Sequence, residues 1–131
     1  MKLLLDTHIW LWSLLEPSRL GRRTAAALED PENELWLSPI SVWETLMLAE
    51  RDRVVLLPDA EQWIRACLGR LPFHEAAVNA EVALASRALR IPSDDPADRF
   101  LAATARVYDL TLVTADARLR RIPHVSVLPN A

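Results

Sequence analysis

Short apolar runs alternate along the chain with longer stretches in which apolar residues recur at helical spacing. The short runs predict strands, the first of them buried on both faces; they are Met1–Leu5, Leu35–Leu37, Leu110–Thr114 and Val125–Leu128. The longer stretches predict helices; they are Thr7–Leu15, Thr24–Glu29, Pro39–Arg51, Asp59–Arg70, Glu75–Leu89 and Ala97–Tyr108. Strands that alternate with helices predict an α/β fold with a central, mostly parallel sheet of about 4–5 strands, flanked by helices on both faces.

Residues suited to N-caps precede several of these helices. Pro39 suits the first position of a helix, which makes Ser38 the natural N-cap. Asp95 precedes Pro96 in the same way, and we expect its carboxylate to accept a hydrogen bond from the backbone of the following helix. Thr7 is the expected N-cap of the first helix.

Three of the predicted helices have an apparent apolar side. In the helix Asp59–Arg70, the residues on this side are Trp63, Ile64, Cys67 and Leu68, followed by Leu71. In the helix that begins at Pro39, Ile40, Trp43 and Met47 fall near one side, together with Glu50. In the predicted helix Glu75–Leu89, the residues in line are Val78, Val82, Ala85 and Leu89. The chain has five tryptophans, and their placement favours packing in the core or in a dimer interface over stacking on bases for most of them.

The composition fits one folded domain. The chain has 131 residues, of which 51% are hydrophobic, so we predict a single domain over residues 1–131 with a substantial core. Cys67 is the only cysteine, which excludes an internal disulfide and favours a reducing cytoplasm. Asp6 and His8 interrupt the apolar N-terminal run, and no run approaches the length of a membrane span. We therefore expect a cytoplasmic protein that does not cross a membrane.

Four acidic residues lie at or near the expected carboxyl ends of the strands, where parallel α/β folds bind their ligands. Asp6 ends the first strand, and Asp116 follows the apolar run LTLVT. Glu44 lies in the second turn of the helix after the second strand, and Asp98 lies in the first turn of the helix before LTLVT. This placement makes the four acids candidates for one shared site.

Each acid also has a purely structural interpretation. Asp98 would complement the dipole of its helix, and Ser41 with Glu44 matches a capping box. Pro39 argues against the box because it moves the cap to Ser38 and leaves Glu44 free. Glu44 then lies in the apolar stretch ISVWETLML, where a carboxylate needs a partner or a metal.

Taken together, the acids indicate a hard divalent cation. Converging carboxylates repel each other, and Mg²⁺ or Mn²⁺, which prefer oxygen ligands, make such an arrangement tolerable. A metal of this kind activates water and neutralises charge on a phosphodiester oxygen, so phosphodiester hydrolysis is the favoured chemistry. The formal net charge of −3 is unusual for a nucleic-acid binder. Metal bound to the four carboxylates would leave the other charges close to balance.

Four segments of the chain resemble the successive motifs of PIN-domain proteins, and in particular the VapC toxins of type II toxin–antitoxin pairs. They are LLLDTHIWLW, SPISVWE, DPADRFLAATA and LVTADARL, in this order and over nearly the whole chain. The resemblance implies a small α/β domain with a central parallel sheet and a Mg²⁺-dependent endoribonuclease activity in which Mn²⁺ can substitute. It also implies a homodimer and a cognate VapB-type antitoxin, whose C-terminal segment would occlude the acidic site.

The same motifs assign roles to individual residues. The acids that match the family's metal-binding and catalytic positions are Asp6, Glu44, Asp98 and Asp116, and Thr114 matches the hydroxyl residue near the last of them. We expect Thr114 to contact the RNA substrate. Arg99 is expected either to pair with a carboxylate or to face RNA phosphate. Arg118 is expected either to hold the RNA backbone or to be a solvated surface residue. His8 is expected to pack or hydrogen-bond near the start of its helix rather than to ligate the metal.

Two other functions fit parts of the pattern. A phosphatase of the haloacid dehalogenase type also has an aspartate at the end of its first strand. It needs a second aspartate two residues later, where this chain has His8, and a lysine, whereas Lys2 is the only lysine here. A catalytically silent PIN-like binding module is the stronger alternative. A missing site acid would indicate it, and all four acids are present.

Overall fold

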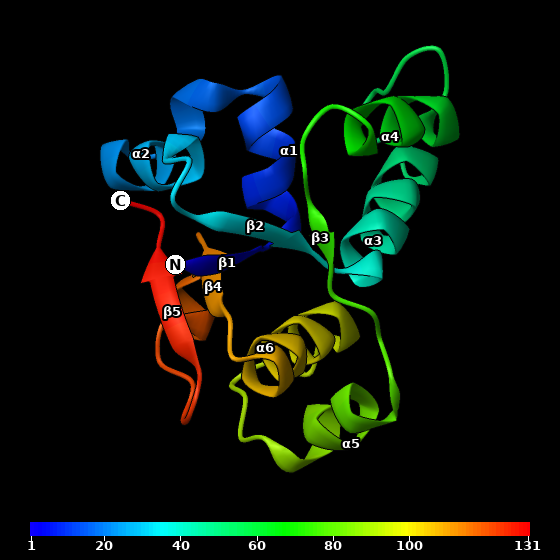
Figure 1. Ribbon diagram of the computed structural model, residues 1–131. Coiled ribbons are helices and arrows are strands. Elements are labelled where there is room, and N and C mark those ends of the chain that lie inside the picture. The colour runs from blue at the N-terminus through cyan, green and yellow to red at the C-terminus, as the bar shows by residue number, and fades with distance from the viewer.

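Five parallel strands form the centre of the computed structural model, which describes residues 1–131. In chain order they are β1 (Lys2–Leu5), β2 (Glu34–Leu37), β3 (His74–Glu75), β4 (Thr111–Thr114) and β5 (Ser126–Pro129). Their order across the sheet is β3-β2-β1-β4-β5 (Figure 1). The predicted α/β fold with a parallel sheet is confirmed, and β3 is a strand that the sequence pattern did not predict.

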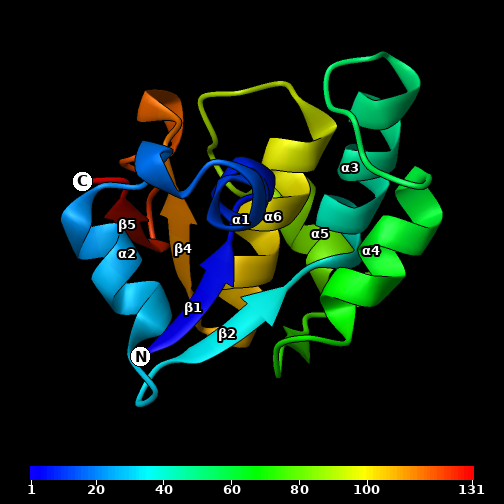
Figure 2. The same ribbon diagram turned by 90° about the horizontal axis from the view of Figure 1, so that it is seen from above.

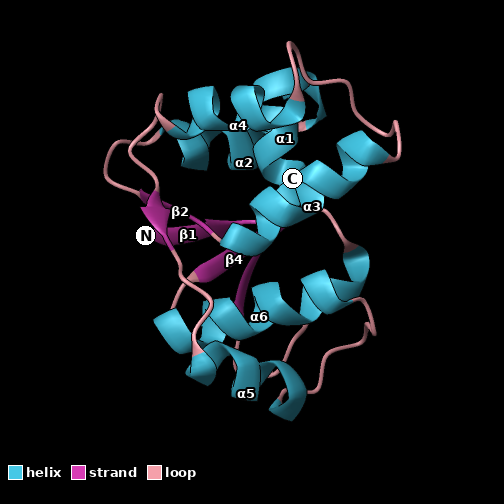
Figure 3. Ribbon diagram, turned by 90° about the vertical axis from the view of Figure 1, so that its right-hand side faces the viewer, coloured by secondary structure: helices cyan, strands magenta, loops and turns pink.

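Helices cover both faces of this sheet. They are α1 (Thr7–Leu15), α2 (Arg22–Glu29), α3 (Pro39–Glu50), α4 (Ala60–Leu68), α5 (Ala80–Ala88) and α6 (Pro96–Tyr108), with two short 3-10 turns, η1 (Pro17–Arg19) and η2 (Ala117–Leu119). Figure 1 shows α1, α2 and α4 above the sheet and α5 and α6 below it, while α3 lies beside the sheet. Figure 3 shows the same two layers from the side.

The central strand β1 explains this layering. Leu4 packs in the cluster that contains the α6 residue Leu101, whereas Leu3 and Leu5 pack in the cluster that contains Trp10 of α1. All three leucines of β1 are at most 1% exposed. Alternate side chains of a strand point to opposite faces, so a continuous apolar run is what a strand between two helix layers requires. Figure 2 shows β1 between β2 and β4.

The predicted helix Glu75–Leu89 is wrong in its first part. Glu75 belongs to β3, and Ala76 donates its backbone N–H to the carbonyl oxygen of Leu37 in β2, at 2.9 Å. The helix α5 begins only after Asn79, whose side chain accepts from the N–H of Val82 at 3.0 Å. The spacing of apolar residues did not distinguish β3 from α5, because a strand of two residues is too short to show the alternation of apolar and polar residues that is typical of strands.

Two expectations about helix ends and faces are also corrected. Asp6, not Thr7, is the N-cap of α1, and its carboxylate accepts from the N–H of Thr7 at 2.7 Å. The buried residues of α3 are Ser41 and Thr45, whereas Trp43 is 47% exposed. Small hydroxyl side chains can be buried here because they are hydrogen-bonded: Thr45 donates to the Ser41 carbonyl at 2.8 Å.

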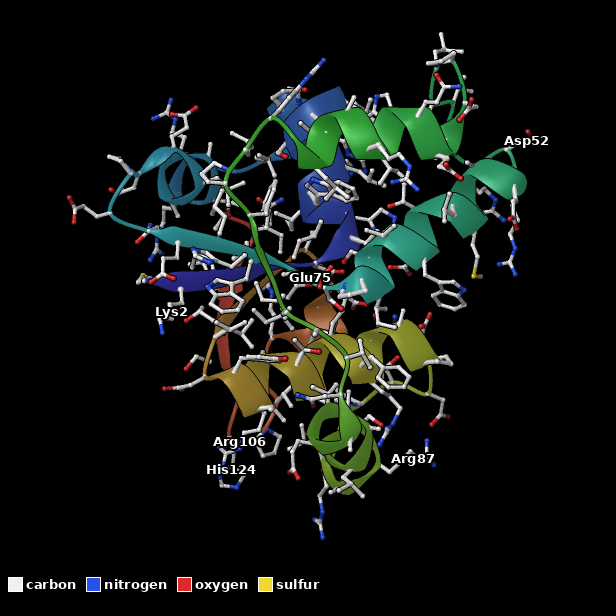
Figure 4. All side chains as sticks on the ribbon, turned by 45° about the vertical axis from the view of Figure 1, so that its right-hand side comes forward. Lys2, Asp52, Glu75, Arg87, Arg106 and His124 are labelled. Carbon is white, nitrogen blue, oxygen red and sulfur yellow. The ribbon has the colours of Figure 1, made fainter.

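Polar and charged side chains lie on the outside of the layers. Figure 4 shows Arg87 on α5, Arg106 on α6 and His124 before β5 pointing away from the sheet, and all three residues are exposed. None of the helices combines the length and the apolarity that crossing a membrane requires.

Candidate active site

A pocket of about 440 Å³ opens at the carboxyl ends of the central strands, and all four predicted acids line it: Asp6, Glu44, Asp98 and Asp116. They come from the end of β1, from α3, from α6 and from the segment after β4. Adjacent parallel strands end at the same edge of a sheet, which explains how residues so distant in the sequence meet. His8, Trp12, Arg19 and Arg118 also line the pocket.

Asp6 is the most deeply placed acid and is only 8% exposed. One carboxylate oxygen accepts from the N–H of Thr7 at 2.7 Å, and the other accepts from the hydroxyl of Thr114 at 2.6 Å. Burial raises the pKa of Asp6 above its ordinary value, and the hydrogen bond from Thr114 offsets part of this rise. The environment of the Asp6 carboxylate therefore favours its neutralisation, either by a proton or by a cation.

Thr114 connects two of the acids. It is fully buried, donates to Asp6, and accepts from the backbone N–H of Asp116 at 3.0 Å. We expected this hydroxyl to contact substrate, but its burial and its two hydrogen bonds assign it to positioning Asp6 and Asp116 instead.

Asp98 is held at the start of α6. The cap predicted for Asp95 is confirmed, since its carboxylate accepts from the N–H groups of Ala97 and Asp98 at 2.8 and 3.4 Å. The hydroxyl of Ser93 donates to Asp98 at 2.7 Å. Burial raises the pKa of Asp98, the Ser93 hydrogen bond lowers it in part, and the charges of Asp95 and Asp6 raise it further.

Glu44 lines the pocket from α3. The predicted N-cap Ser38 is confirmed, because its hydroxyl accepts from the N–H of Ile40 at 3.0 Å. Burial raises the pKa of Glu44, and the nearby charge of Asp6 adds to the rise. His8 lines the same pocket but packs its ring against Trp12, with centroids 5.9 Å apart.

Asp116 has a different environment because of Arg118. The guanidinium of Arg118 donates from Nη2 to Asp116 Oδ2 at 2.7 Å and from Nε to both oxygens at 3.2 and 3.3 Å. These hydrogen bonds lower the pKa of Asp116. The same Nη2 reaches Asp98 Oδ2 at 3.4 Å.

Arg99 does not take the role expected from its position beside Asp98. Its nitrogens donate to the carbonyl oxygens of Ser86, Ser93 and Leu89 at 3.0, 3.2 and 3.2 Å. The structure therefore gives Arg99 a structural role, fastening the end of α5 and the following loop to α6, in place of the expected contact with RNA or with a carboxylate.

The donor set suits Mg²⁺ or Mn²⁺ by its chemistry, because carboxylate oxygens are the ligands that these hard cations prefer. The acids are not assembled at ligating distance, however: no three His, Cys, Asp or Glu side chains are arranged to hold one ion. Hydrogen bonds to Thr7 and Thr114 occupy Asp6, and Arg118 occupies Asp98 and Asp116. The pocket thus brings the carboxylates together while protein donors satisfy three of them.

Sequence reasoning missed Ser93 as a residue of this site. Ser93 lies five residues before Asp98, and it is 8% exposed in the loop that precedes α6. The only signal in the sequence was a serine two residues before the N-cap Asp95. The direction of the Ser93 side chain could not be predicted, because a loop has no regular repeat of inward-facing and outward-facing side chains.

Comparison with known proteins identifies the family. The family profile of the PIN domain matches residues 3–125. The chain belongs to the PIN-domain family. A relative of the chain, Ribonuclease VapC22 of Mycobacterium tuberculosis, is 36% identical over 124 residues, which cover 92% of each chain.

Solved structures show the same PIN fold. The chain matches a structure of VapBC2 from Rickettsia felis, bound to a DNA fragment from the promoter, with a TM-score of 0.72, 19% identity and 98% of each chain covered. It matches a toxin–antitoxin complex from Klebsiella pneumoniae with a TM-score of 0.62, 24% identity and coverage of 98% of this chain and 97% of the other. The resemblance to PIN-domain proteins of the VapC type is confirmed.

Proposed function

We propose that this chain is a single-domain, metal-dependent endoribonuclease that acts in the cytoplasm as the VapC-type toxin of a toxin–antitoxin pair. The observation that carries the proposal is one pocket lined by Asp6, Glu44, Asp98 and Asp116. The relative named as a ribonuclease, which shares 36% identity over 92% of this chain, supports RNA as the substrate.

The four acids are the residues that would hold Mg²⁺, or Mn²⁺ in its place. When bound, such a cation activates water and offsets the charge that develops on the phosphodiester. The chain's own residues prepare the site: Thr114 orients Asp6, and Ser93 with the N-terminus of α6 orients Asp98. Arg118 is 59% exposed at the rim, where its guanidinium is suited to an RNA phosphate.

We also propose a VapB-type antitoxin as the protein partner, and a homodimer as the free form. The solved structures with the same fold support the antitoxin, since they include VapBC2 and a toxin–antitoxin complex. An apolar pocket of about 400 Å³ is lined by Leu14 of α1, Leu28 of α2 and Leu20 of the segment between these helices, among others, and it supports a protein–protein contact of this molecule.

Cleavage of a total cellular RNA pool tests the activity. We expect the wild-type protein to release discrete fragments with Mg²⁺ or Mn²⁺ and none with EDTA. Asp98→Asn should lower the rate by at least about 100-fold, because one of the metal-binding charges is lost. Asp94→Asn is the matched control, since Asp94 is exposed and does not line the pocket. It should cleave like the wild type.

The result also separates the alternatives. Cleavage by folded Asp98→Asn at the wild-type rate, or cleavage that persists in EDTA, would contradict the proposed site. Absence of cleavage by every protein, with an intact fold by circular dichroism, would favour the catalytically silent binding module.

A further inference from the structure

Arg118 is the one cationic side chain paired with the site acids. Of the five ion pairs in the structure, the two that involve these acids both belong to it. Arg19, the other arginine that lines the pocket, is directed elsewhere: it lies 4.3 Å from the centroid of the Trp12 ring and pairs with Glu16 at 3.7 Å. Arg118 therefore supplies the positive charge between α6 and the segment after β4.

Arg118 contacts carboxylate oxygens of two of the candidate metal ligands. Its Nη2 lies 2.7 Å from Asp116 Oδ2 and 3.4 Å from Asp98 Oδ2, so one nitrogen bridges the two carboxylates. A guanidinium hydrogen bond occupies a lone pair of the carboxylate and neutralises charge that would otherwise attract a cation. A cation and Arg118 cannot both satisfy these lone pairs.

We propose that Arg118 acts as an internal counter-cation that competes with the divalent metal for Asp98 and Asp116. The side chain of Arg118 must move away from the two carboxylates before both of them can bind the metal. This inference rests on the proposed metal-dependent function. The side chain can leave at low cost, because it is 59% exposed and both of its side-chain partners are these acids. Once displaced, it remains at the rim of the same pocket as a free guanidinium, which fits a phosphate of the RNA. Loading of the metal and release of a phosphate-binding group are thereby coupled.

Metal affinity measures this competition directly. Isothermal titration of Mn²⁺ into the full chain, without RNA, compares the wild type with Arg118→Ala, Arg118→Lys and Arg120→Ala. We expect Arg118→Ala to bind Mn²⁺ about three- to tenfold more tightly, since a competing charge at contact distance is removed. Arg118→Lys keeps the charge and should stay within about twofold of the wild type. Arg120 is exposed and makes no ion pair, so Arg120→Ala controls for net charge and should also stay within about twofold.

The outcomes separate this inference from the proposed function. Unchanged or weaker Mn²⁺ binding by folded Arg118→Ala, with normal binding by the wild type, would overturn the competition and leave the metal site standing. An equal gain in Mn²⁺ affinity in Arg120→Ala would show that the effect comes from net charge alone, and it would also overturn the competition. Absence of Mn²⁺ binding by all four proteins would overturn the metal site itself, and the competition with it.

Discussion

At the scale of single residues, the site acids share a pocket but not an electrostatic environment. Burial raises the pKa of Asp6, Glu44 and Asp98, whereas Arg118 lowers the pKa of Asp116. Carboxylates whose pKa is raised by burial destabilise the folded state when they are ionised. Without a bound cation, the ionised acids of the site therefore lower the free energy of unfolding, as is common at functional sites.

Glu44→Gln tests this cost. The folded-state pKa of Glu44 lies above its unfolded value, so the ionised carboxylate destabilises the fold at neutral pH, and the penalty is relieved as the pH falls through the raised pKa. In EDTA at neutral pH we expect the variant to be more stable than the wild type by about 0.5–1 kcal/mol. This difference should shrink toward acidic pH. Urea denaturation across the pH range measures it, with Glu50→Gln, an exposed position on the same helix, as the control. A Glu44→Gln protein that is less stable at neutral pH would contradict the argument.

The sequence predicted the residues of the site better than their contacts. Asp6 lies at the end of a strand and Asp95 precedes a helix, and both are local features of the sequence. The bridge from Arg118 to Asp98 and the three carbonyl contacts of Arg99 depend on how loops lie against α6. A long flexible side chain can reach many partners, and only the three-dimensional arrangement selects among them.

At the scale of elements, the position of Asp98 depends on how α5, α6 and the loop between them are held together. The fold class was predictable because strands and helices alternate along the chain, but the boundary between β3 and α5 was not. Arg99 is partly buried, and its hydrogen bonds to carbonyl groups at the end of α5 and in the following loop hold these segments against α6.

Arg99→Met tests this fastening. Methionine keeps much of the apolar stem but leaves three carbonyl groups without their donor, so we expect a loss of about 2–3 kcal/mol in the free energy of unfolding. Faster amide exchange should be concentrated in residues 86–95. Arg87→Met serves as the comparison, because Arg87 is exposed on α5 and donates none of these bonds (Figure 4). Equal effects of the two substitutions on stability and exchange would argue against a specific role for Arg99.

At the scale of the whole molecule, the pocket joins parts that otherwise belong to different layers. Asp6 ends the central strand, Glu44 comes from α3, and Asp98 comes from the layer of α5 and α6. The parallel sheet brings these elements to one edge, but nothing in the sheet itself binds α3 to α6 at the pocket. A cation held by acids from all of these elements would connect them.

Metal binding should therefore stabilise the molecule as a unit. At a Mn²⁺ concentration about 100 times the dissociation constant, we expect the melting temperature to rise by roughly 10 °C relative to EDTA. Hydrogen exchange should slow together around Glu44, around Asp98 and in the segment that carries Asp116, because one ion would hold acids from three separate parts of the chain. Asp6→Asn should remove both effects, since Asp6 lies between these parts on the central strand. Protection confined to one of the segments would show a cation on the surface, bound by a single element, and would contradict a shared metal centre.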